Sequence, residues 1–519
     1  MNLVEEIGHL PGLVDDRPLA GPQPGLLLMM RTAGPTLAVV PLADLSSTPM
    51  TVTVRRQTPY TFLGQTTSLC GECLALVPAK IVAEEGRVYY LKRCRRHGVE
   101  KVLVSTDPAY WRLCHDYLKP GDRPLVLQTR TERGCPYDCG LCPDHEQHSC
   151  LALIDVNEAC NLACPVCFSD SSPQRSLHRP LAEIERMMDT LVASEGEPDL
   201  LQISGGEPTI HPEILEILAA AKRRPIRHVM LNTNGIRIAE DPEFVNRLAD
   251  LRPGFEVYLQ FDSLNPEAHL NLRGADLTRI RRQALENLER AGLSTTLVVV
   301  VKQGVNDDEL PAIIDHALQW RCVRGVVFQP VQDAGRNEGF DPSKDRFPLS
   351  AIRRRIVDSG GPFGAGDIIP LPCNPESIAI GYALRKGATI APVTSFFPRE
   401  LLVEALPNAI TFEKYPELHR QVLEFFSLAT AECNNERKLA ELLCCLPEVP
   451  LPAGLGYEDT FRVVIVEFMD AHNFCIGRVK RSCIHFVTPD QKIIPFETHN
   501  LFYRDAAARE RLRRSLEGA

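Results

Sequence analysis

The sequence predicts an α/β fold: a partial (β/α)6 TIM barrel, preceded by a small metal-binding module and followed by an α+β domain. Between residues 151 and 331, apolar β-branched runs alternate with helical patterns, which favours parallel strands joined by crossover helices. Before this region, cysteines occur in pairs and triplets around short β-like runs. The apolar core that such short runs can form is too small to be stable without a bound metal. A chain of 519 residues has room for roughly three or four such units.

The barrel is expected to contain six strands and five helices, two units short of a complete eight-unit barrel. The predicted strands are Leu151–Val156, Leu200–Ser204, His228–Asn232, Glu256–Phe261, Thr295–Val301 and Val326–Gln329. The predicted helices are Leu181–Ser194, Pro212–Arg223, Pro242–Leu251, Leu277–Ala291 and Asp308–Trp320. In parallel βα folds the chemistry lies at the carboxyl ends of the strands.

The rest of the chain is expected to divide into four further segments. They are an N-terminal extension (1–50), a cysteine-rich metal-binding module (51–118), an auxiliary cluster segment (119–150) and, after the barrel (151–331), a C-terminal domain (332–519). Within the last, a helix is predicted at Pro416–Cys445 and a β-like segment at Phe461–Phe496.

Composition and charge narrow the class of protein. With 44% hydrophobic and 24% charged residues, the chain is typical of globular proteins. The net charge is 57 − 67 = −10, so no nucleic-acid partner is expected. A local basic patch such as Arg93, Arg95 and Arg96 could in principle contact a nucleic acid. Such a run of arginines is more typical of a solvated surface. No apolar run reaches the roughly 20 residues of a membrane span, so no transmembrane segment is expected.

Cysteine usage indicates metal binding. Of 18 cysteines, 11 lie between Cys70 and Cys167. Acidic residues at the N-terminus, such as Glu5 and Asp15, replace the basic flank of a signal peptide, so a cytoplasmic location is expected. In a reducing cytosol, closely spaced cysteines are metal ligands or redox groups more often than disulfides.

The first barrel strand is followed by a C-x3-C-x2-C motif made by Cys160, Cys164 and Cys167. Three thiolates can hold a cubane iron-sulfur cluster and leave one iron open, and an amine with a carboxylate can occupy such an open position. A fourth cysteine elsewhere would instead make a closed structural site. The second strand ends in Ser204-Gly-Gly-Glu-Pro208, where glycines admit a ligand to the backbone and the Glu207 carboxylate suits an ammonium group.

Together these two motifs resemble the radical S-adenosylmethionine (radical SAM) superfamily over residues 150 to about 331. The resemblance implies reductive cleavage of S-adenosylmethionine to a 5′-deoxyadenosyl radical, which abstracts hydrogen from unactivated carbon. It implies that Cys160, Cys164 and Cys167 bind a 4Fe-4S cluster, and that Gly205, Gly206 and Glu207 contact the ammonium of S-adenosylmethionine. Cofactor contacts are also expected from Asn232, Asn234, Asp262 and Arg273, of which the asparagines suit ribose hydroxyls and Arg273 a carboxylate. The Asn-Gly turn at Asn234 and the loop residue Arg273 could equally have a purely structural role. No catalytic residue is assigned.

A second C-x3-C-x2-C motif lies upstream, at Cys135, Cys139 and Cys142. Cys150 follows it and could complete four thiolates, and no strand precedes the motif. These cysteines are therefore expected to bind at least one auxiliary 4Fe-4S cluster, which leaves the downstream triad as the S-adenosylmethionine site. Cys373 and Cys483 are candidates for a further cluster, whereas Cys322, Cys433, Cys444, Cys445 and Cys475 are interpreted as packing residues.

The N-terminal module contains Cys70, Cys73, Cys94 and His97. This C-x2-C and C-x2-H spacing predicts a mononuclear zinc or iron site. Cys114 is an alternative fourth ligand.

The longer pattern, including Gly134-Cys-Pro-Tyr-Asp-Cys-Gly-Leu-Cys-Pro143 and Ile494-Pro-Phe-Glu-Thr-His-Asn500, resembles one radical enzyme group from about residue 65 to 504. That group contains archaeal tetraether lipid synthases and the enzyme that methylates 7,8-dihydro-6-hydroxymethylpterin. The expected activity is carbon-carbon bond formation at an unactivated carbon of a lipid alkyl chain, with methylation of a pterin as the alternative. The implied partners are a small-molecule or lipid substrate, with peripheral membrane contact in the lipid case, and a reductant such as ferredoxin or flavodoxin. An iron-sulfur electron-transfer protein is the non-enzymatic alternative.

Overall fold

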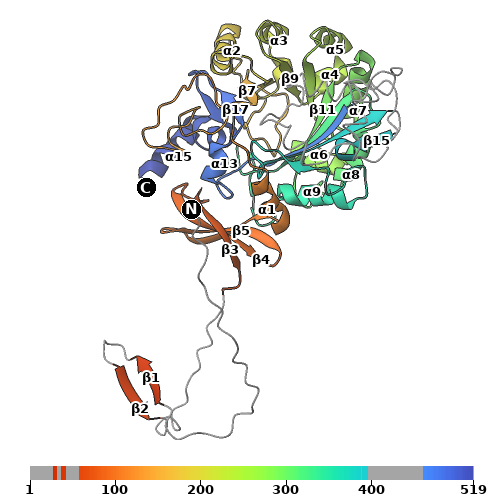
Figure 1. The fold of residues 1–519 in the computed structure, drawn as a ribbon. Helices are drawn as coiled ribbons and strands as arrows, with labels where there is room; N and C mark the ends of the chain where they lie inside the picture. Colours follow the sequence, from red (N-terminus) through yellow and green to blue (C-terminus); the bar gives the residue numbers. More distant parts are fainter. Residues whose placement is uncertain (1–26, 32–36, 42–57, 387–388, 396–459, 518–519) are drawn as a thin grey trace, which may run out of the picture. The chain divides into compact units, whose positions relative to one another are not determined.

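The computed structural model describes residues 27–31, 37–41, 58–386, 389–395 and 460–517, and the chain divides into two units, Met1–Thr58 and Pro59–Ala519. Figure 1 shows its fold. In the first unit the described residues form an antiparallel pair, β1 (Leu27–Arg31) and β2 (Leu37–Pro41). The sequence pattern predicts only an extension there.

The centre of the second unit is a 12-stranded sheet in which β15 pairs with β14 and the remaining strands follow the order β13-β14-β16-β12-β11-β10-β9-β8-β7-β17-β18. Its middle strands are the predicted barrel strands, parallel and in sequence order. They are β7 (Leu151–Asp155), β8 (Leu200–Ser204), β9 (His228–Thr233), β10 (Phe255–Gln260), β11 (Thr295–Val301) and β12 (Val323–Pro330). The α/β fold with a parallel barrel-type sheet is therefore confirmed.

C-terminal residues extend this sheet at both edges. Strand β16 (Thr460–Val466) pairs in parallel with β12, and β17 (Ile484–Val487) pairs in parallel with β7. Antiparallel strands complete the edges: β13 (Ile369–Pro370), β14 (Ile378–Lys386), β15 (Thr389–Pro392) and β18 (Ile493–Pro495). The predicted β-like segment at residues 461–496 is thus three separate strands that join the barrel sheet.

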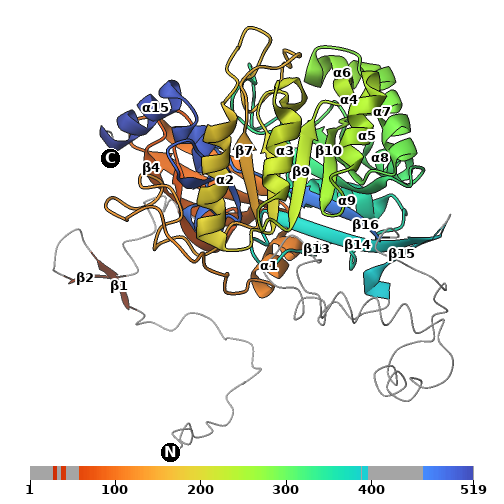
Figure 2. The same ribbon diagram turned by 90° about the horizontal axis from the view of Figure 1, so that it is seen from above.

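Helices cover the outer face of the sheet, as Figure 2 shows for α2 and α3 across β7 to β9. Their apolar sides and the outward-facing strand residues form one core, which includes Met188, Leu231 and Leu288. The barrel helices are α2 (Leu181–Glu195), α3 (Ile214–Lys222), α4 (Ile236–Glu240), α5 (Pro242–Ala249), α6 (Pro266–Arg273), α7 (Thr278–Ala291) and α8 (Leu310–Ala317), and α9 (Leu349–Asp358) follows β12.

Local signals explain where several of these helices begin and end. Asp241 accepts a hydrogen bond from the Phe244 backbone N–H, and Pro242 occupies the first turn of α5, which is the favoured pairing of cap and proline. Helices α6 and α7 end at Gly274 and Gly292, both in the left-handed conformation that glycine adopts without a steric penalty. The bounds of the five predicted helices agree within a few residues, whereas the short helices α4 and α6 were not predicted.

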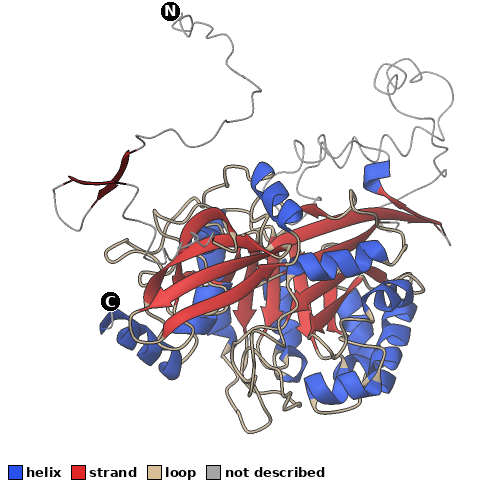
Figure 3. Cartoon of the chain, turned by 90° about the horizontal axis from the view of Figure 1, so that it is seen from below, coloured by secondary structure: helices blue, strands red, loops and turns tan. Residues whose placement is uncertain are grey.

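The inner face of the sheet forms a second core. Leu153, Met230, Tyr258, Val327 and Val464 belong to it, each contributed by a different strand. Figure 3, seen from below, shows the sheet strands running side by side, with helices on their far side. The residues at the carboxyl ends of the parallel strands lie beyond this core, where the candidate site is found.

A four-stranded antiparallel sheet precedes the barrel. It contains β3 (Thr61–Leu69), β4 (Leu76–Glu84), β5 (Arg87–Cys94) and β6 (Gly98–Ser105), and α1 (Pro108–Asp116) follows it. Its apolar residues, including Tyr90, pack with C-terminal residues such as Phe474 and Phe502. The surrounding C-terminal elements are α13 (Ile476–Lys480), α14 (Phe496–Thr498), a π-helical turn (His499–Tyr503) and α15 (Ala506–Glu517).

Some predictions concern residues outside those described. The helix predicted at 416–445, together with Cys433, Cys444 and Cys445, lies there. Among the helices that the structure describes, none has the length and apolar character that a membrane span requires.

Candidate active site

One pocket extends along the inner face of the sheet to the carboxyl ends of the parallel strands, and most of the predicted cofactor residues line it. The predicted residues among its lining are Cys160, Cys164, Cys167, Gly205, Gly206, Glu207, Asn232, Asn234 and Arg273. Asp262 is fully buried and contacts Arg273. No further cysteine among the described residues lines this pocket. Three thiols without a fourth are the donor set that leaves one iron of a cubane open, so the residues present fit such a cluster.

The cysteine loop is fastened to the end of β8 by backbone hydrogen bonds. Gly206 N–H donates to Asn157 O and Glu207 N–H donates to Ala159 O, each at 2.9 Å. A Cβ atom at Gly205 would lie 2.5 Å from Asn157 O, and one at Gly206 would lie 2.2 Å from Ala159 O. The two glycines are therefore required because the cysteine loop itself approaches their backbone closely. The sequence pattern predicts a close approach by a ligand but not by this loop.

Glu207 ties β8 to the end of β9. Its Oε1 accepts hydrogen bonds from Thr209 Oγ1 (2.6 Å), Thr209 N–H (3.0 Å) and Thr233 Oγ1 (2.7 Å), and its Oε2 accepts one from Asn234 N–H (2.7 Å). The residue is 1% exposed. Burial raises the pKa of this carboxyl group, and the four hydrogen bonds oppose that rise. These hydrogen bonds favour the charged carboxylate over the neutral acid.

Arg273 and Asp262 form a buried ion pair behind the cysteines. Asp262 has a positive φ of 68°. Burial by itself would raise the pKa of Asp262, but Arg273 outweighs that effect and lowers it. Burial raises the pKa of the Cys164 thiol, and the same guanidinium only partly opposes that rise. Burial likewise raises the pKa of Cys160 to about 12. A positive charge beside the thiols favours their thiolate form, which is the form that binds iron.

Two arginines that no motif indicated also hold this site. Arg336 donates to Cys164 O (2.6 Å) through Nε and to Ser171 O (2.7 Å) through Nη2, so it joins the middle of the cysteine loop to the segment that follows Cys167. Arg281, which is 1% exposed, contacts the Asn234 carbonyl. Burial lowers its pKa to about 10. A lone arginine on a loop or helix carries no sequence signal for such a role.

Amide side chains from four of the parallel strands line the pocket. Gln202, Asn232, Gln260 and Gln329 come from β8, β9, β10 and β12. Gln260 Nε2 donates to Asn232 Oδ1 (2.8 Å), and Asn232 Nδ2 donates to Ser204 Oγ (3.2 Å). Asn232 is therefore part of a hydrogen-bonded row across the strands.

Aromatic side chains line another part of the same pocket. The rings of Phe468 and Phe496 stack with centroids 3.8 Å apart, and Phe168 lies 5.4 Å from Phe496. Both Phe468 and Phe496 come from the C-terminal region. The pocket thus combines a flat aromatic wall with hydrogen-bonding amides.

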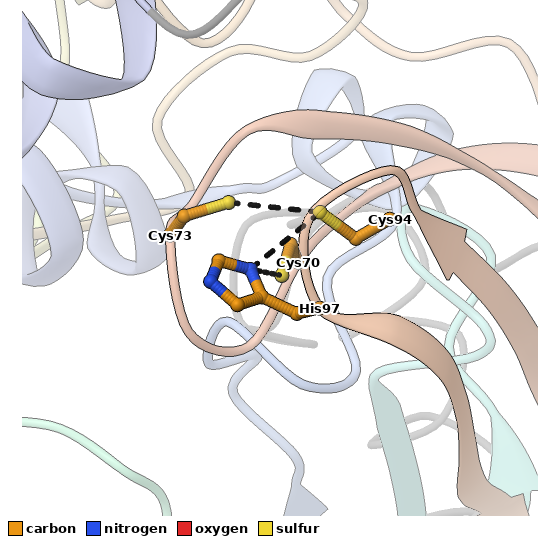
Figure 4. A group of neighbouring side chains, drawn as sticks. All are labelled: Cys70, Cys73, Cys94 and His97. Carbon is orange, nitrogen blue, oxygen red and sulfur yellow. Dashed lines mark hydrogen bonds between the residues drawn. The ribbon is translucent and has the colours of Figure 1, made fainter.

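The N-terminal module brings Cys70, Cys73, Cys94 and His97 together (Figure 4), with all four ligand atoms within 4.8 Å of one another. His97 Nδ1 lies 3.3 Å from Cys70 Sγ and 3.6 Å from Cys94 Sγ. Cys114 is buried on α1 outside this group. Three thiols and one imidazole are a typical tetrahedral zinc set, and His97, not Cys114, occupies the fourth position.

Cys150 does not lie where its spacing in the sequence predicts. Its thiol is grouped with those of Cys373 and Cys483, so the prediction that Cys150 completes the upstream set is corrected. Consecutive spacing suggested the upstream partner, whereas pairing of β7 with β17 brings Cys483 beside Cys150. Near the upstream set, Cys139 Sγ lies 3.1 Å from Thr498 Oγ1.

Comparison with known families places this site in a class. The radical SAM superfamily matches residues 154–317, and the HMPTM N-terminal zinc ribbon domain matches residues 62–106. The zinc ribbon match suggests zinc at the N-terminal metal site. The chain belongs to the radical SAM superfamily, whose fold implies a 4Fe-4S cluster and S-adenosylmethionine, and the superfamily prediction is confirmed.

Among individual proteins, the chain is 31% identical over 480 residues to 7,8-dihydro-6-hydroxymethylpterin dimethyltransferase of Methanocaldococcus jannaschii, covering 85% of this chain and 94% of that protein. It is 29% identical over 203 residues to GTP 3',8-cyclase of Chlorobaculum tepidum, covering 37% of this chain and 59% of the cyclase. A solved structure of Streptococcus suis SuiB bound to S-adenosylmethionine matches with 19% identity and a TM-score of 0.33, covering 40% of this chain and 46% of SuiB.

These relatives bear on the expected substrate. The M. jannaschii relative carries the name of a pterin methyltransferase, which agrees with the alternative expectation. None of these comparisons supports carbon-carbon bond formation on a lipid chain, which was the first expectation.

Proposed function

We propose that this radical SAM enzyme methylates a pterin, in the manner that the name of its M. jannaschii relative describes. The observation that carries the proposal is the 31% identity over 480 residues, which spans 85% of this chain and therefore extends well beyond the barrel. A relationship limited to the barrel would leave the substrate class open.

The pocket lining supports a flat polar substrate. A pterin presents hydrogen-bond donors and acceptors along the edge of a planar ring, and it needs amide partners for that edge and aromatic faces for its plane. Gln202, Gln260 and Gln329 supply amides, and Phe468 and Phe496 supply a ring face.

The cofactor contacts are proposed from the residues that share the pocket. Cys160, Cys164 and Cys167 would hold the 4Fe-4S cluster, and Glu207 with the Gly205–Gly206 backbone would face the ammonium of S-adenosylmethionine. When bound, this pair supplies the 5′-deoxyadenosyl radical that is general to the superfamily. Arg273 is already paired with Asp262, so its proposed contribution is positive charge near the thiolates.

The upstream triad of Cys135, Cys139 and Cys142 is proposed to hold an auxiliary cluster that passes electrons. A low-potential protein such as ferredoxin or flavodoxin would supply them.

The proposal is tested with anaerobically reconstituted full-length protein. It is incubated with S-adenosylmethionine, a reductant and 7,8-dihydro-6-hydroxymethylpterin, and the products are separated by mass spectrometry. We expect 5′-deoxyadenosine and methionine from one S-adenosylmethionine, together with a pterin that has gained one or two methyl groups. Each methyl group would come from a further S-adenosylmethionine, which leaves as S-adenosylhomocysteine. Cys160→Ala should abolish 5′-deoxyadenosine and the methylated pterin, whereas Cys322→Ala, which changes a buried cysteine outside the pocket, should leave both unchanged.

Parallel reactions with archaeal-type membrane lipids separate the alternatives. Coupled lipid chains without a methylated pterin would overturn the pterin proposal in favour of the lipid reading. If the wild-type protein has an intact cluster but forms no 5′-deoxyadenosine, the hypothesis that it is an enzyme would be overturned. An electron-transfer protein would then be favoured.

A further inference from the structure

An exposed apolar run precedes the upstream triad in the sequence. Leu125, Val126 and Leu127 are 75%, 50% and 43% exposed, and no other described residues form an exposed run of three large apolar side chains. Their backbone is held against the end of α2, because Leu125 N–H donates to Ser194 O (2.7 Å) and Ser194 Oγ donates to Val126 O (3.1 Å). Single exposed apolar residues are common on protein surfaces, whereas a contiguous group is typical of a contact site.

The same segment is attached directly to the loop of the upstream triad. Gln128 N–H donates to Leu141 O (3.0 Å), and Leu141 lies between Cys139 and Cys142. Burial raises the pKa of Cys139 well above its usual value, and the nearby thiols of Cys135 and Cys142 add to that rise. Three neighbouring thiols fit the ligand set of a cluster. Cys139 and Cys142 are buried, whereas Cys135 is partly exposed, so the protein cover of the triad is thinnest at Cys135.

The segment that contains the apolar run also carries exposed arginines. Between residues 123 and 133 there are three arginines and one acidic residue, Glu132, which gives a net charge of 3 − 1 = +2. Asp138 in the triad loop is already engaged by the backbone N–H groups of Glu132 and Gly134, each at 2.8 Å. The three exposed arginines are Arg123, Arg130 and Arg133.

Helix α15 brings a second group of arginines to the triad loop. Ser515 Oγ lies 3.3 Å from Tyr137 Oη in that loop, and Leu512 packs in the same apolar cluster as Cys135. The helix contains four arginines and two glutamates, a net charge of 4 − 2 = +2, and Glu510 is paired with two of the arginines. Both groups are positive in a chain whose net charge is −10. The arginines of α15, all exposed, are Arg509, Arg511, Arg513 and Arg514.

We propose that the apolar run 125–127 and these two groups of arginines form the docking site of an acidic electron-carrier protein, here named the carrier surface. The proposal rests on the proposed function in one respect, because the upstream triad must hold a cluster that takes up electrons. One electron leaves the reduced carrier and reduces that cluster, and the oxidised carrier then dissociates. The substrate of the enzyme does not enter the proposal.

The composition of the carrier surface fits such a partner. An apolar centre accompanied by arginines is typical of protein interfaces, and transient electron-transfer complexes bury only a small area, which matches a centre of three side chains. Positive charge attracts an acidic carrier and speeds its association, whereas the net charge of −10 disfavours its approach elsewhere. The charge distribution therefore directs the carrier to the face where the upstream triad has its thinnest cover.

The first test measures binding to the full-length, anaerobically reconstituted enzyme. The probes are two acidic carriers, a bacterial ferredoxin and a flavodoxin, at about 50 mM and about 500 mM salt. In the double variant Arg130→Glu, Arg133→Glu the dissociation constant at low salt should rise about tenfold or more through slower association, and the difference should shrink at high salt. The control is Arg279→Glu with Arg282→Glu, which makes the same charge change at two exposed residues of α7. It should change the dissociation constant less than about threefold.

A second test separates docking from chemistry. Formation of 5′-deoxyadenosine is driven either by the reduced carrier or by dithionite, a small reductant that needs no docking surface. The Arg130 and Arg133 variant should lose about tenfold in the carrier-driven rate below saturation, and it should keep the dithionite-driven rate and the iron content of the wild type. Leu125→Ala with Leu127→Ala should instead speed dissociation of the carrier, because truncation of the apolar centre removes contact area.

Four results would refute the carrier surface. They are no binding of either carrier to the wild type, an unchanged affinity in the Arg130 and Arg133 variant, an equal loss of affinity in the α7 control, and an equal loss of the dithionite-driven rate. Binding of RNA or of phosphatidylglycerol vesicles that depends on these arginines, without binding of a carrier, would assign the surface to another partner.

Two further measurements keep the test decisive. If the Arg130 and Arg133 variant does not fold, Arg513→Glu with Arg514→Glu on α15 provides the second measurement, with the same expected loss of affinity. Absence of 5′-deoxyadenosine from the wild type with dithionite would refute the proposed function, whereas the affinity of the carrier would still decide whether the carrier surface exists.

Discussion

Arg273 binds both carboxylate oxygens of Asp262, through Nε to Oδ2 at 2.7 Å and through Nη2 to Oδ1 at 2.5 Å. This fork joins the end of α6 to the loop after β10, directly behind Cys164 of the cysteine loop. Both partners are removed from water, so the pair is retained only as a unit: either member alone would be a buried, uncompensated charge.

Substituting Asp262 should therefore destabilise the protein strongly. We expect Asp262→Ala to lower the free energy of unfolding by about 3–5 kcal/mol, measured by urea denaturation of the anaerobic protein. The matched control is Arg282→Ala, which breaks the exposed pair between Arg282 and Glu286 on α7 and should cost less than about 0.5 kcal/mol. Equal effects of the two variants would contradict the assignment of Asp262 and Arg273 as a structural pair.

Glu207→Gln is expected to weaken S-adenosylmethionine binding while the cluster stays in place. A lost charge-assisted hydrogen bond is worth about 1.5–3 kcal/mol, so the dissociation constant should rise about ten- to hundredfold. Equilibrium binding and iron analysis on the same sample give the two readouts. Glu286→Gln, on the exposed side of α7, serves as the control. A loss of iron in Glu207→Gln would mean that its bonds to Thr209, Thr233 and Asn234 matter only for the fold.

The fourth ligand of the N-terminal metal can be tested by one pair of variants. His97→Ala should lower the zinc content by one equivalent, because His97 Nδ1 lies among the three thiols. Cys114→Ser should keep that zinc, since its thiol lies outside the group. Metal analysis after dialysis against a chelator distinguishes the two. Zinc loss in Cys114→Ser, with full zinc in His97→Ala, would reverse the assignment.

The charged neighbours of His472 predict that the stability of the contact between the N-terminal module and the C-terminal region depends on pH. Its Nδ1 lies 2.8 Å from Glu100 Oε1 on β6, and its Nε2 lies 3.5 Å from Asp333 Oδ2. Lys92 and Asp470 are the other charged groups nearby. Burial alone would lower the pKa of His472, but the two carboxylates outweigh it and raise the pKa from 6.5 to about 9.

Because the folded pKa is raised, the stabilisation is complete below about pH 6.5 and is lost as the pH rises through about 9. We expect a loss on the order of 2 kcal/mol, allowing for partial solvent contact. Hydrogen exchange of the 98–105 backbone between pH 6 and pH 9.5, corrected for the intrinsic exchange rate, measures it. His472→Gln should abolish this pH dependence. An unchanged profile in that variant would assign the effect to another group.

The parallel strands could be predicted because their signal is local. Leu200–Ser204 and Thr295–Val301 are buried apolar runs that end at polar or glycine residues, and their predicted bounds coincide with β8 and β11. The superfamily motif likewise lies within two adjacent strand ends. Patterns of this kind need no knowledge of distant residues.

The remainder depends on contacts between residues far apart in the sequence. Nothing in Thr460–Val466 or Ile484–Val487 indicates that these strands pair with β12 and β7, so they were assigned to a separate domain. For the same reason Cys150 was grouped with its sequence neighbours. Arg336 was missed because its contacts with the cysteine loop follow from the fold and not from a motif.

The strand order has a consequence for synthesis on the ribosome. Strand β7 is the first barrel strand to be synthesised, but its outer neighbour β17 is synthesised near the end of the chain. Strand β12 likewise has no partner on its outer edge until β16 has been synthesised. Until the C-terminus emerges, both edges of the nascent sheet expose unpaired backbone groups, which are prone to pairing with other chains. The barrel therefore cannot be finished domain by domain, and truncation after residue 460 should yield an aggregating fragment instead of a smaller enzyme.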